Sequence, residues 1–380
     1  MFFKDIIGQQ EIKQHLRQSM HDGYIPHARM LTGTEGVGKV ALALAYARYL
    51  CCTDRNVEDA CGTCPSCIKF NKLIHPDLHF VYPIVKNDKK KKEICDDYLK
   101  EWREFVLKNP YFNYNLWLEF IGAENSQGLI YARESDEIIH KINLKAYESQ
   151  YKIILVWLPE KMHESCANKL LKMIEEPPAN TVFLLISEAP DMVIGTIQSR
   201  TQRLHVPPVD KESMTARLKE LTVGTSNRME ERLQEELVHL ANGNYLRLLE
   251  LLDNTDDRHE FLELFKSIVR CSWRKNLKKM RSNADIFAAM GRDRQKAFLS
   301  YSNNLIRENF FYNLRIPEIN YINREEAEFS NNFSPYVKEG NVIGLIDEFT
   351  LAERHIESNV NPRMVFFDLS LKIAVLIKQK

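Results

Sequence analysis

The sequence predicts an α/β fold, a P-loop domain with a parallel sheet, followed by a part that is almost wholly helical. Three observations predict this class. Over residues 28–52, a short apolar segment is followed by a glycine-rich loop and then by an Ala/Leu-rich helix. Apolar strand segments then alternate with helices between residues 151 and 209, which is the pattern of βαβ units. After Asp210 the apolar residues follow helical spacing almost throughout.

Length and composition narrow the class further. A chain of 380 residues predicts two or three domains. Lys and Arg number 52, and so do Asp and Glu, so net charge gives no support for nucleic-acid binding. Apolar runs such as 153–158 fall far short of the roughly 20 residues of a membrane helix. The N-terminus lacks a signal-peptide layout, so we expect a cytoplasmic protein with reduced cysteines and no membrane partner.

The first elements form a helix, a strand and a phosphate-type loop. Helical spacing of the apolar residues predicts a helix over 5–22, and Gly23 offers a stop. The segment 28–33 is a short apolar strand that leads into the sequence GTEGVGK, and 39–52 is an Ala/Leu-rich helix. Strand, glycine loop and helix in this order are the context that a P-loop needs.

The P-loop itself is degenerate. In the pattern G-x-x-x-x-G-K-[ST], Gly33, Gly38 and Lys39 fit, Gly36 adds a third glycine, and Val40 replaces the hydroxyl that holds Mg²⁺. The residues therefore predict a relic of a nucleotide site. Weak binding of ATP or ADP through Lys39 stays open at this point, and so does a lysine that only faces solvent.

A cluster of cysteines follows the P-loop helix. Cys61, Cys64 and Cys67 form C-x₂-C-x₂-C, and Cys52 lies nine residues before Cys61, with Cys51 as a neighbouring substitute. Thiolates bind Zn²⁺ tetrahedrally, and two-residue gaps let successive sulfurs turn onto one ion. With four thiolates no coordination position is left open, so the prediction is a structural zinc site. The isolated cysteines, expected to be plain buried thiols, are Cys95, Cys166 and Cys271.

The segment 85–125 interrupts the α/β pattern. We expect an irregular stretch whose lysine run, Lys89–Lys92, is solvated; contact with phosphates is the alternative. The aromatic-rich end of this segment predicts a packed insertion. The α/β pattern resumes with strands at 151–158, 181–187 and 203–209 and with helices at 163–176 and 190–202.

Several ordered motifs carry a family resemblance. They are IGQQEIKQHL, the P-loop, the four-cysteine insertion, HPDLHF, ANKLLKMIEEPPANTVFLLIS, TIQSRTQRLHV and IESNVNPRMVFFDLSL. Together the sequence resembles the bacterial replicative clamp-loader family of AAA+ proteins, most closely its delta-prime type, over nearly the whole chain except about 85–125. The resemblance implies a P-loop domain over 1–208 with a four-cysteine zinc module at about 51–68 and the insertion, a helical lid over 209–270, and a helical collar for oligomerisation over 271–380.

The resemblance also separates two roles. Motor subunits of this family hydrolyse ATP to open a ring-shaped sliding clamp and close it on primed DNA, whereas the delta-prime type is a stator without hydrolysis. A motor needs an acid pair at the end of the strand that reads IILVW, but here Trp157, Leu158 and Pro159 precede the first acid, Glu160. Val40 removes the other protein ligand of the metal. Both departures predict a subunit that does not hydrolyse ATP.

Arg200 is the residue expected to act in catalysis. The SRT at 199–201 is similar to the family's Ser-Arg-Cys motif, whose arginine reaches the γ-phosphate of the neighbouring subunit. The alternative is a surface arginine paired with a carboxylate. Arg247 lies one position late for the family's sensor arginine, so a helix-surface role is favoured. Glu175 and Glu176 of EEPP are assigned no chemistry.

Three functional hypotheses remain. The leading one is a delta-prime-like stator of the DNA polymerase III clamp loader, assembled with the gamma/tau motor subunits and delta, and acting on the sliding clamp and primed DNA through the complex. The first alternative is an active gamma/tau-type ATPase, against which Val40 and the missing acid pair argue. The second is a zinc-finger DNA-binding protein, but acids surround the cysteines and no basic stripe accompanies them.

Overall fold

The core of the N-terminal part is a five-stranded sheet in which every paired neighbour is parallel, as the sequence predicts. The strand order is β2-β3-β4-β1-β5, which places the P-loop strand between β4 and β5. Three strands are buried at every residue, as expected of a parallel sheet covered on both faces. The strands are β1 (Ala28–Thr32), β2 (Leu78–Val81), β3 (Lys152–Trp157), β4 (Thr181–Ser187) and β5 (Gln202–His205).

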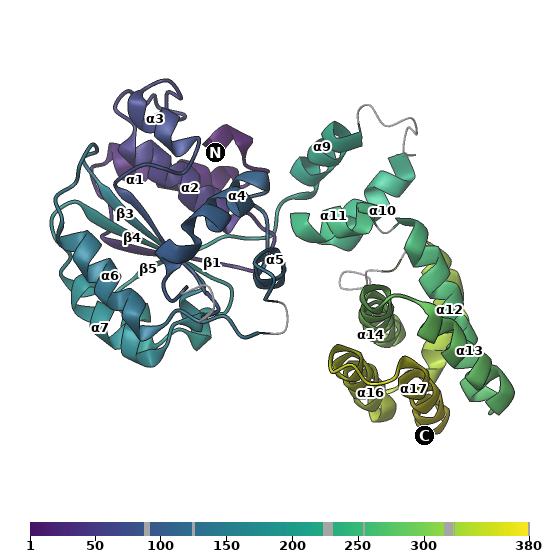
Figure 1. Cartoon of the computed structure of the whole chain (residues 1–380). Coiled ribbons are helices and arrows are strands. Elements are labelled where there is room, and N and C mark those ends of the chain that lie inside the picture. The colour runs from purple at the N-terminus through teal and green to yellow at the C-terminus, as the bar shows by residue number, and fades with distance from the viewer. Residues whose placement is uncertain are drawn as a thin grey trace. The chain divides into compact units, whose positions relative to one another are not determined.

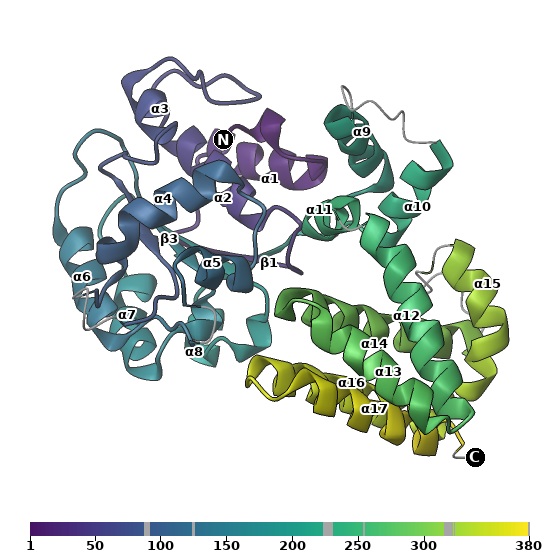
Figure 2. The same ribbon diagram turned by 45° about the vertical axis from the view of Figure 1, so that its right-hand side comes forward.

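Helices cover this sheet on both sides. In Figures 1 and 2, α1 and α2 lie on one side of the sheet, and α6 and α7 lie on the other. Every residue of α2 is buried, because its small and aliphatic side chains pack against β1, β3 and β4. The helices are α1 (Gln10–His21), α2 (Lys39–Cys51), α3 (Pro65–Phe70), α6 (Ala132–Asn143), α7 (Glu164–Glu175) and α8 (Gly195–Gln198), and short 3-10 turns are η1 (Phe3–Asp5), η3 (Pro159–Lys161) and η4 (Pro190–Met192).

The insertion is more regular than expected. The prediction of an irregular stretch over 85–125 is wrong for much of it, because it holds η2 (Cys95–Tyr98), α4 (Leu99–Lys108) and α5 (Tyr114–Phe120). Its aromatic residues do pack, as predicted. Trp102 stacks on Tyr82 with ring centroids 4.0 Å apart and contacts Trp117 at 5.1 Å and Trp157 at 5.4 Å. The insertion is therefore fixed to the end of β3. Lys89–Lys91 of the lysine run lie outside the described residues.

After β5 the described residues hold helices and one short 3-10 turn. The cluster at the centre of the C-terminal helices is aromatic, and Phe287 stacks on Phe366 at 4.2 Å. In Figures 1 and 2, α16 and α17 run side by side, and α14 packs against α16. The helices are α9 (Lys211–Thr222), α10 (Glu231–Ala241), α11 (Tyr245–Asp253), α12 (Thr255–Trp273), α13 (Leu277–Ala289), α14 (Arg292–Leu314), α15 (Arg324–Phe333), α16 (Glu339–Glu357) and α17 (Pro362–Leu376), and the turn is η6 (Ser334–Tyr336).

The chain divides into two compact units, a first unit over 1–249 and a second unit over 250–380. The finer division into a lid at 209–270 and a collar at 271–380 stays a prediction. Among the described helices, none is long and apolar enough to cross a membrane. The computed structural model describes residues 1–86, 92–123, 126–222, 231–253, 255–314, 322 and 324–378.

Candidate functional site

The P-loop connects β1 to α2 and has the backbone that its glycines allow. Gly33, Gly36 and Gly38 have φ angles of 155°, 71° and 90°, a region that strains any residue with a Cβ atom. Lys39 follows as the first residue of α2, and it is only 4% exposed. The alternative of a lysine that faces solvent is therefore wrong.

Lys39 is held by groups of its own chain. Its Nζ donates a hydrogen bond to the carbonyl oxygen of Thr34 and lies 3.7 Å from Glu188 Oε1. Burial lowers the pKa of Lys39, while the carboxylates of Glu188, Glu160 and Glu35 act in the opposite direction. Burial also raises the pKa of Glu188. A phosphate group approaching Lys39 would have to displace Glu188 and would meet the negative charge of its neighbours.

The end of β3 offers no acid pair to this loop. Trp157 is 1% exposed and packs in the aromatic cluster of the insertion. Leu158 has a left-handed backbone with φ of 56°, and it turns the chain into η3. Glu160 comes next, and its Oε1 accepts hydrogen bonds from the backbone N–H groups of Glu188 at 2.8 Å and Ala189 at 3.1 Å. Glu160 thus caps the end of β4.

The insertion fills the space above the P-loop. The cavity that remains there is about 10 Å³, enough for about one water molecule. Tyr111 lies so close to Gly38 that a Cβ atom on Gly38 would come within 2.9 Å of Tyr111 Cε1. The Tyr111 hydroxyl accepts a hydrogen bond of 3.0 Å from the backbone N–H of Ile7, which fixes the ring there. The cavity is lined by Gly36, Gly38, Lys39, Val40, Pro110, Tyr111, Phe112, Trp157 and Glu188.

The other two glycines also meet groups of this chain. A Cβ atom on Gly36 would lie 1.7 Å from Asn244 Oδ1, and the backbone N–H of Tyr245 donates to the carbonyl oxygen of Gly36 at 3.1 Å. A Cβ atom on Gly33 would lie 2.4 Å from the carbonyl oxygen of Val206. All three glycines are therefore required by the packing of the chain itself. No sequence signal pointed to Tyr111 or Asn244 as the residues that cover the loop.

The four predicted cysteine ligands come together. Cys52 is the C-cap of α2 and Cys64 is the N-cap of α3, and the sulfurs of the four cysteines lie within 4.8 Å of one another. The Sγ–Sγ distances are 3.5 Å for Cys52–Cys61, 3.9 Å for Cys52–Cys64 and 4.0 Å for Cys61–Cys67. Tetrahedral ligation at a Zn–S distance of about 2.3 Å separates the sulfurs by about 3.8 Å, so the cluster fits one such ion.

Backbone N–H groups are directed at three of the four sulfurs, while burial raises the pKa values of Cys52 and Cys67. The N–H of Cys61 points to Cys52 Sγ, the N–H of Cys64 to Cys61 Sγ, and the N–H of Cys67 to Cys64 Sγ, at 3.3 to 3.4 Å. Burial acts to raise the pKa of Cys64, but these and other hydrogen bonds outweigh it and lower the pKa to about 6. Cys51 takes no part in the cluster. It contacts the carbonyl oxygen of Tyr151, and burial raises its pKa to about 12.

Arg48 attaches the cysteine module to the rest of the first unit. Its guanidinium donates to the carbonyl oxygens of Cys67 at 2.7 Å and Met1 at 3.2 Å, and it lies 3.8 Å from the ring centroid of Phe2. The module has almost no apolar core of its own, because Ala60 and Phe2 are the only members of its cluster besides the cysteines. The isolated cysteines are buried, as predicted: Cys95, Cys166 and Cys271.

Arg200 follows α8 and has a carboxylate partner within the chain. Its Nε lies 3.0 Å from Glu175 Oε2, and its Nη1 donates to the carbonyl oxygen of Thr196 at 3.1 Å. The side chains of Arg200 and Glu175 are 32% and 53% exposed. Sequence reasoning gave Glu175 no role, although EEPP was noted. Arg247 is half-buried on α11, and its backbone N–H donates to Asn244 Oδ1.

Comparison with known proteins identifies the family. A family model described as DNA polymerase III, delta subunit, matches residues 8–210. The DNA polymerase III subunit gamma of Buchnera aphidicola (Acyrthosiphon pisum) is 25% identical over 253 residues, or 67% of this chain and 58% of the relative. The subunit delta′ of Buchnera aphidicola (Baizongia pistaciae) is 28% identical over 57% of this chain and 56% of the relative. The subunit tau of Bacillus subtilis is 23% identical over 66% of this chain and 37% of the relative.

The chain thus spans less than two thirds of the length of each of these relatives. Among solved structures, a DNA polymerase III gamma subunit-related protein of Thermotoga maritima aligns with 97% of this chain and 100% of its own, at 13% identity and a TM-score of 0.40. The predicted membership in the clamp-loader family is confirmed, while the relatives include both delta′ and gamma/tau subunits. Because the family model covers more than half of the sequence, this chain belongs to the DNA polymerase III delta subunit family.

Proposed function

We propose that this chain is a non-hydrolysing, delta-prime-type subunit of a DNA polymerase III clamp loader. The observation that carries the proposal is the closed P-loop. Tyr111 lies over Gly38, Lys39 is bound to Thr34 and Glu188, and the remaining cavity is about 10 Å³. A subunit without room for nucleotide phosphates contributes to the complex through its surfaces. Its work is to hold partners in place while neighbouring subunits hydrolyse ATP.

Arg200 is proposed to serve the ATP site of a neighbouring motor subunit. It lies at the end of α8, and its partner Glu175 is more than half exposed. A surface ion pair of this kind contributes about 0 to 1 kcal/mol, so Arg200 can leave Glu175 when a stronger anion is offered. The γ-phosphate of a bound ATP is such an anion, and a planar, permanently charged guanidinium suits its transition state.

The helices over 271–380 are proposed to form the collar that joins the subunits. On α17, Met364 is 68% exposed, Leu371 37% and Val375 62%. Their spacing of seven and four residues places them on one face of the helix. An exposed apolar stripe of this kind marks a protein interface. The expected neighbours are gamma/tau motor subunits and delta, and the complex brings the subunit to the sliding clamp and primed DNA.

Zinc is the proposed occupant of the cysteine cluster. Four thiolates complete a tetrahedral shell, so the ion has no open position for a substrate. Zinc in this position stabilises the loop between α2 and α3 and takes no part in chemistry. The proposal rests on the sulfur geometry and on the N–H groups directed at the sulfurs.

Nucleotide binding separates the stator from the alternative, an active gamma/tau-type ATPase. Titration of the reduced full chain with Mg²⁺ and a fluorescent ATP analogue should give no saturable binding, and its ATP turnover should stay at background. Val40→Thr restores the missing hydroxyl but leaves Tyr111 in place, so it should change neither result. A gamma-type motor subunit serves as the positive control. One-to-one binding with turnover by the unmodified chain would establish the ATPase instead.

A further inference from the structure

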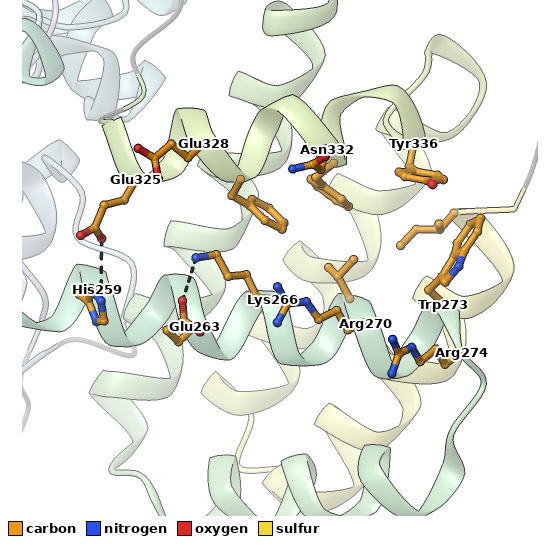
Figure 3. Close-up of a pocket in the computed structure, with 14 residues that line it drawn as sticks. His259, Glu263, Lys266, Arg270, Trp273, Arg274, Glu325, Glu328, Asn332 and Tyr336 are labelled. Atoms are coloured by element: carbon orange, nitrogen blue, oxygen red, sulfur yellow. Dashed lines mark hydrogen bonds and ion pairs between the residues drawn. The ribbon is translucent and has the colours of Figure 1, made fainter.

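A groove in the second unit is not used by the proposed function. It has a volume of about 610 Å³ and lies between α12 on one side and α15 with η6 on the other (Figure 3). This volume is within the usual range of about 300 to 1,000 Å³ for binding pockets. The apolar floor is nearly inaccessible, with Val269, Phe333 and Ile377 at 9%, 4% and 5% exposure. The groove therefore offers a formed apolar surface with polar walls.

The charges of the groove are separated along its length. At one end His259 lies 4.0 Å from Glu325, and Lys266 bonds Glu263 at 2.8 Å. Arg270 on α12 and Arg274, which directly follows α12, are four residues apart, and both are exposed. Among the described residues, neither guanidinium forms an ion pair; Lys266, and more weakly Arg270, lower the pKa of Glu263. This end of the groove therefore presents two exposed guanidinium groups that are available to pair with a carboxylate.

Two exposed aromatic side chains lie beside these arginines. Trp273 and Tyr336 face each other across the groove with ring centroids 4.7 Å apart, and they are 41% and 39% exposed (Figure 3). Lys378 Nζ lies 5.1 Å from the Trp273 ring, which adds a further positive charge. Trp, Tyr and Arg are the side chains that most often carry the energy of protein interfaces. Their combination at one end of an apolar groove is typical of a docking site.

The charge balance favours a protein ligand over a nucleic acid. The three cations Lys266, Arg270 and Arg274 are matched in the lining by the three acids Glu263, Glu325 and Glu328. A nucleic-acid backbone carries negative charge along its whole length and selects a basic surface without such acids. A peptide can place carboxylates at one end and apolar side chains at the other.

We propose that this groove binds an acidic segment of a partner protein. Carboxylates of the segment pair with Arg270 and Arg274, and an adjacent aliphatic or aromatic side chain lies on the floor formed by Phe333 and Ile377. The bound segment covers Trp273. The groove includes neither the P-loop nor Arg200, so a test of this proposal does not test the stator role.

Trp273 provides a direct reporter for the test. The chain has four tryptophans, and the other three, Trp102, Trp117 and Trp157, are at most 1% exposed. Quenching of tryptophan fluorescence by iodide in the full chain therefore reports mainly on Trp273. The probes are dodecapeptides selected from a random display library on the full chain and then synthesised, each with an analogue in which Asp and Glu are replaced by Asn and Gln.

The expected peptides carry Asp or Glu next to Leu, Ile or Phe and protect Trp273 from iodide. Arg270→Glu with Arg274→Glu should weaken their binding roughly tenfold or more, as expected for two opposed charges at an interface. The matched control, Lys278→Glu with Lys279→Glu, changes two exposed charges outside the groove and should leave binding unchanged. The Asn/Gln analogues test the same contact without altering the protein.

Three results would overturn the proposal. Selection of peptides without acids, or equal binding of the acidic peptides and their Asn/Gln analogues, would remove the charge argument. Equal loss of binding in the groove variant and the control variant would show a non-specific charge effect. Protection of Trp273 by oligothymidylate, but by none of the peptides, would assign the groove to single-stranded nucleic acid.

Discussion

Removal of zinc should unfold the cysteine module and leave the sheet intact. The perturbation is either a chelator at neutral pH or Cys64→Ser with Cys67→Ser, which removes two of the four proposed ligands. The module depends on the metal because its apolar cluster contains only Ala60 and Phe2 besides the cysteines. Nothing else in the module resembles a hydrophobic core.

The magnitude follows from the length of the module. Cys52 to Cys67 is 16 residues, and ordering their backbone at about 1 kcal/mol each costs about 16 kcal/mol. A structural zinc ion contributes about 10 to 16 kcal/mol near pH 7. Hydrogen bonds such as those from Arg55 to the carbonyl oxygens of Tyr49, Leu50 and Cys52 add about 1 kcal/mol each. With the metal bound, the favourable terms offset the entropy cost of ordering the module. Without the metal, the ordered module is less stable than the unfolded one by about 10 kcal/mol or more.

The assay is hydrogen exchange with mass spectrometry, combined with metal analysis. Freshly prepared, reduced protein should carry about one zinc per chain. After chelation, peptides covering 53–66 should lose protection, while peptides covering 152–157 and 181–187 should keep it, because these strands are buried at every residue. Cys51→Ser is the matched control. Because Cys51 lies outside the cluster, this variant should retain the metal. Absence of zinc in reduced protein, or full protection of 53–66 after chelation, would refute this reasoning.

Three further predictions test the P-loop, the arginine and the sheet edge. In a reconstituted complex, Arg200→Ala should leave assembly intact yet slow clamp loading and DNA-stimulated ATP hydrolysis, whereas Lys39→Ala should have little effect; the reverse ranking would make this chain a motor. Gly36→Ala should lower the free energy of unfolding by about 2 to 3 kcal/mol in urea titrations, because it combines backbone strain with displacement of the Asn244 helix cap; unchanged stability would contradict the contact. Burial acts to raise the pKa of Asp77, but hydrogen bonds from three backbone N–H groups outweigh it and lower the pKa below 3.8. The Asp77 carboxylate therefore stabilises the fold above pH 3.8, and this contribution is lost as the pH falls through the lowered pKa. Asp77→Asn should therefore cost about 2 kcal/mol at pH 7 and progressively less below about pH 4 in thermal or urea melts, and a pH-independent difference would contradict this assignment.

Most of the sheet could be predicted from the sequence, because the signals of four of its strands are local. Three of the five strands are runs of buried residues next to helices of clear period, and the four cysteines predicted from their spacing bring their sulfurs within 4.8 Å of one another. The short strand β2 was not singled out, since His79 interrupts its four residues. Helix α4 is not predicted because it has only three buried positions, two of them aromatic, and follows a lysine-rich stretch.

The state of the P-loop could not be predicted in full, because it depends on contacts between distant segments. Val40 and the missing acid pair indicated a loss of hydrolysis. That Tyr111 and Asn244 cover the loop depends on packing across 73 and 208 residues of sequence, counted from Gly38 and Gly36. The same holds for Arg200, since its pairing with Glu175 joins the ends of two helices that no spacing rule connects.

The covered P-loop has a thermodynamic consequence. A nucleotide-binding protein gains stability from its ligand by mass action, and its conformation follows the concentrations of ATP and ADP. In this chain the site is filled by Tyr111, which belongs to the same polypeptide. Its effective concentration at the site is therefore fixed, unlike the concentration of a diffusing nucleotide. The loop then keeps one conformation while the ATP pool rises and falls. For the stator role proposed above, this insensitivity to the ATP concentration would be useful.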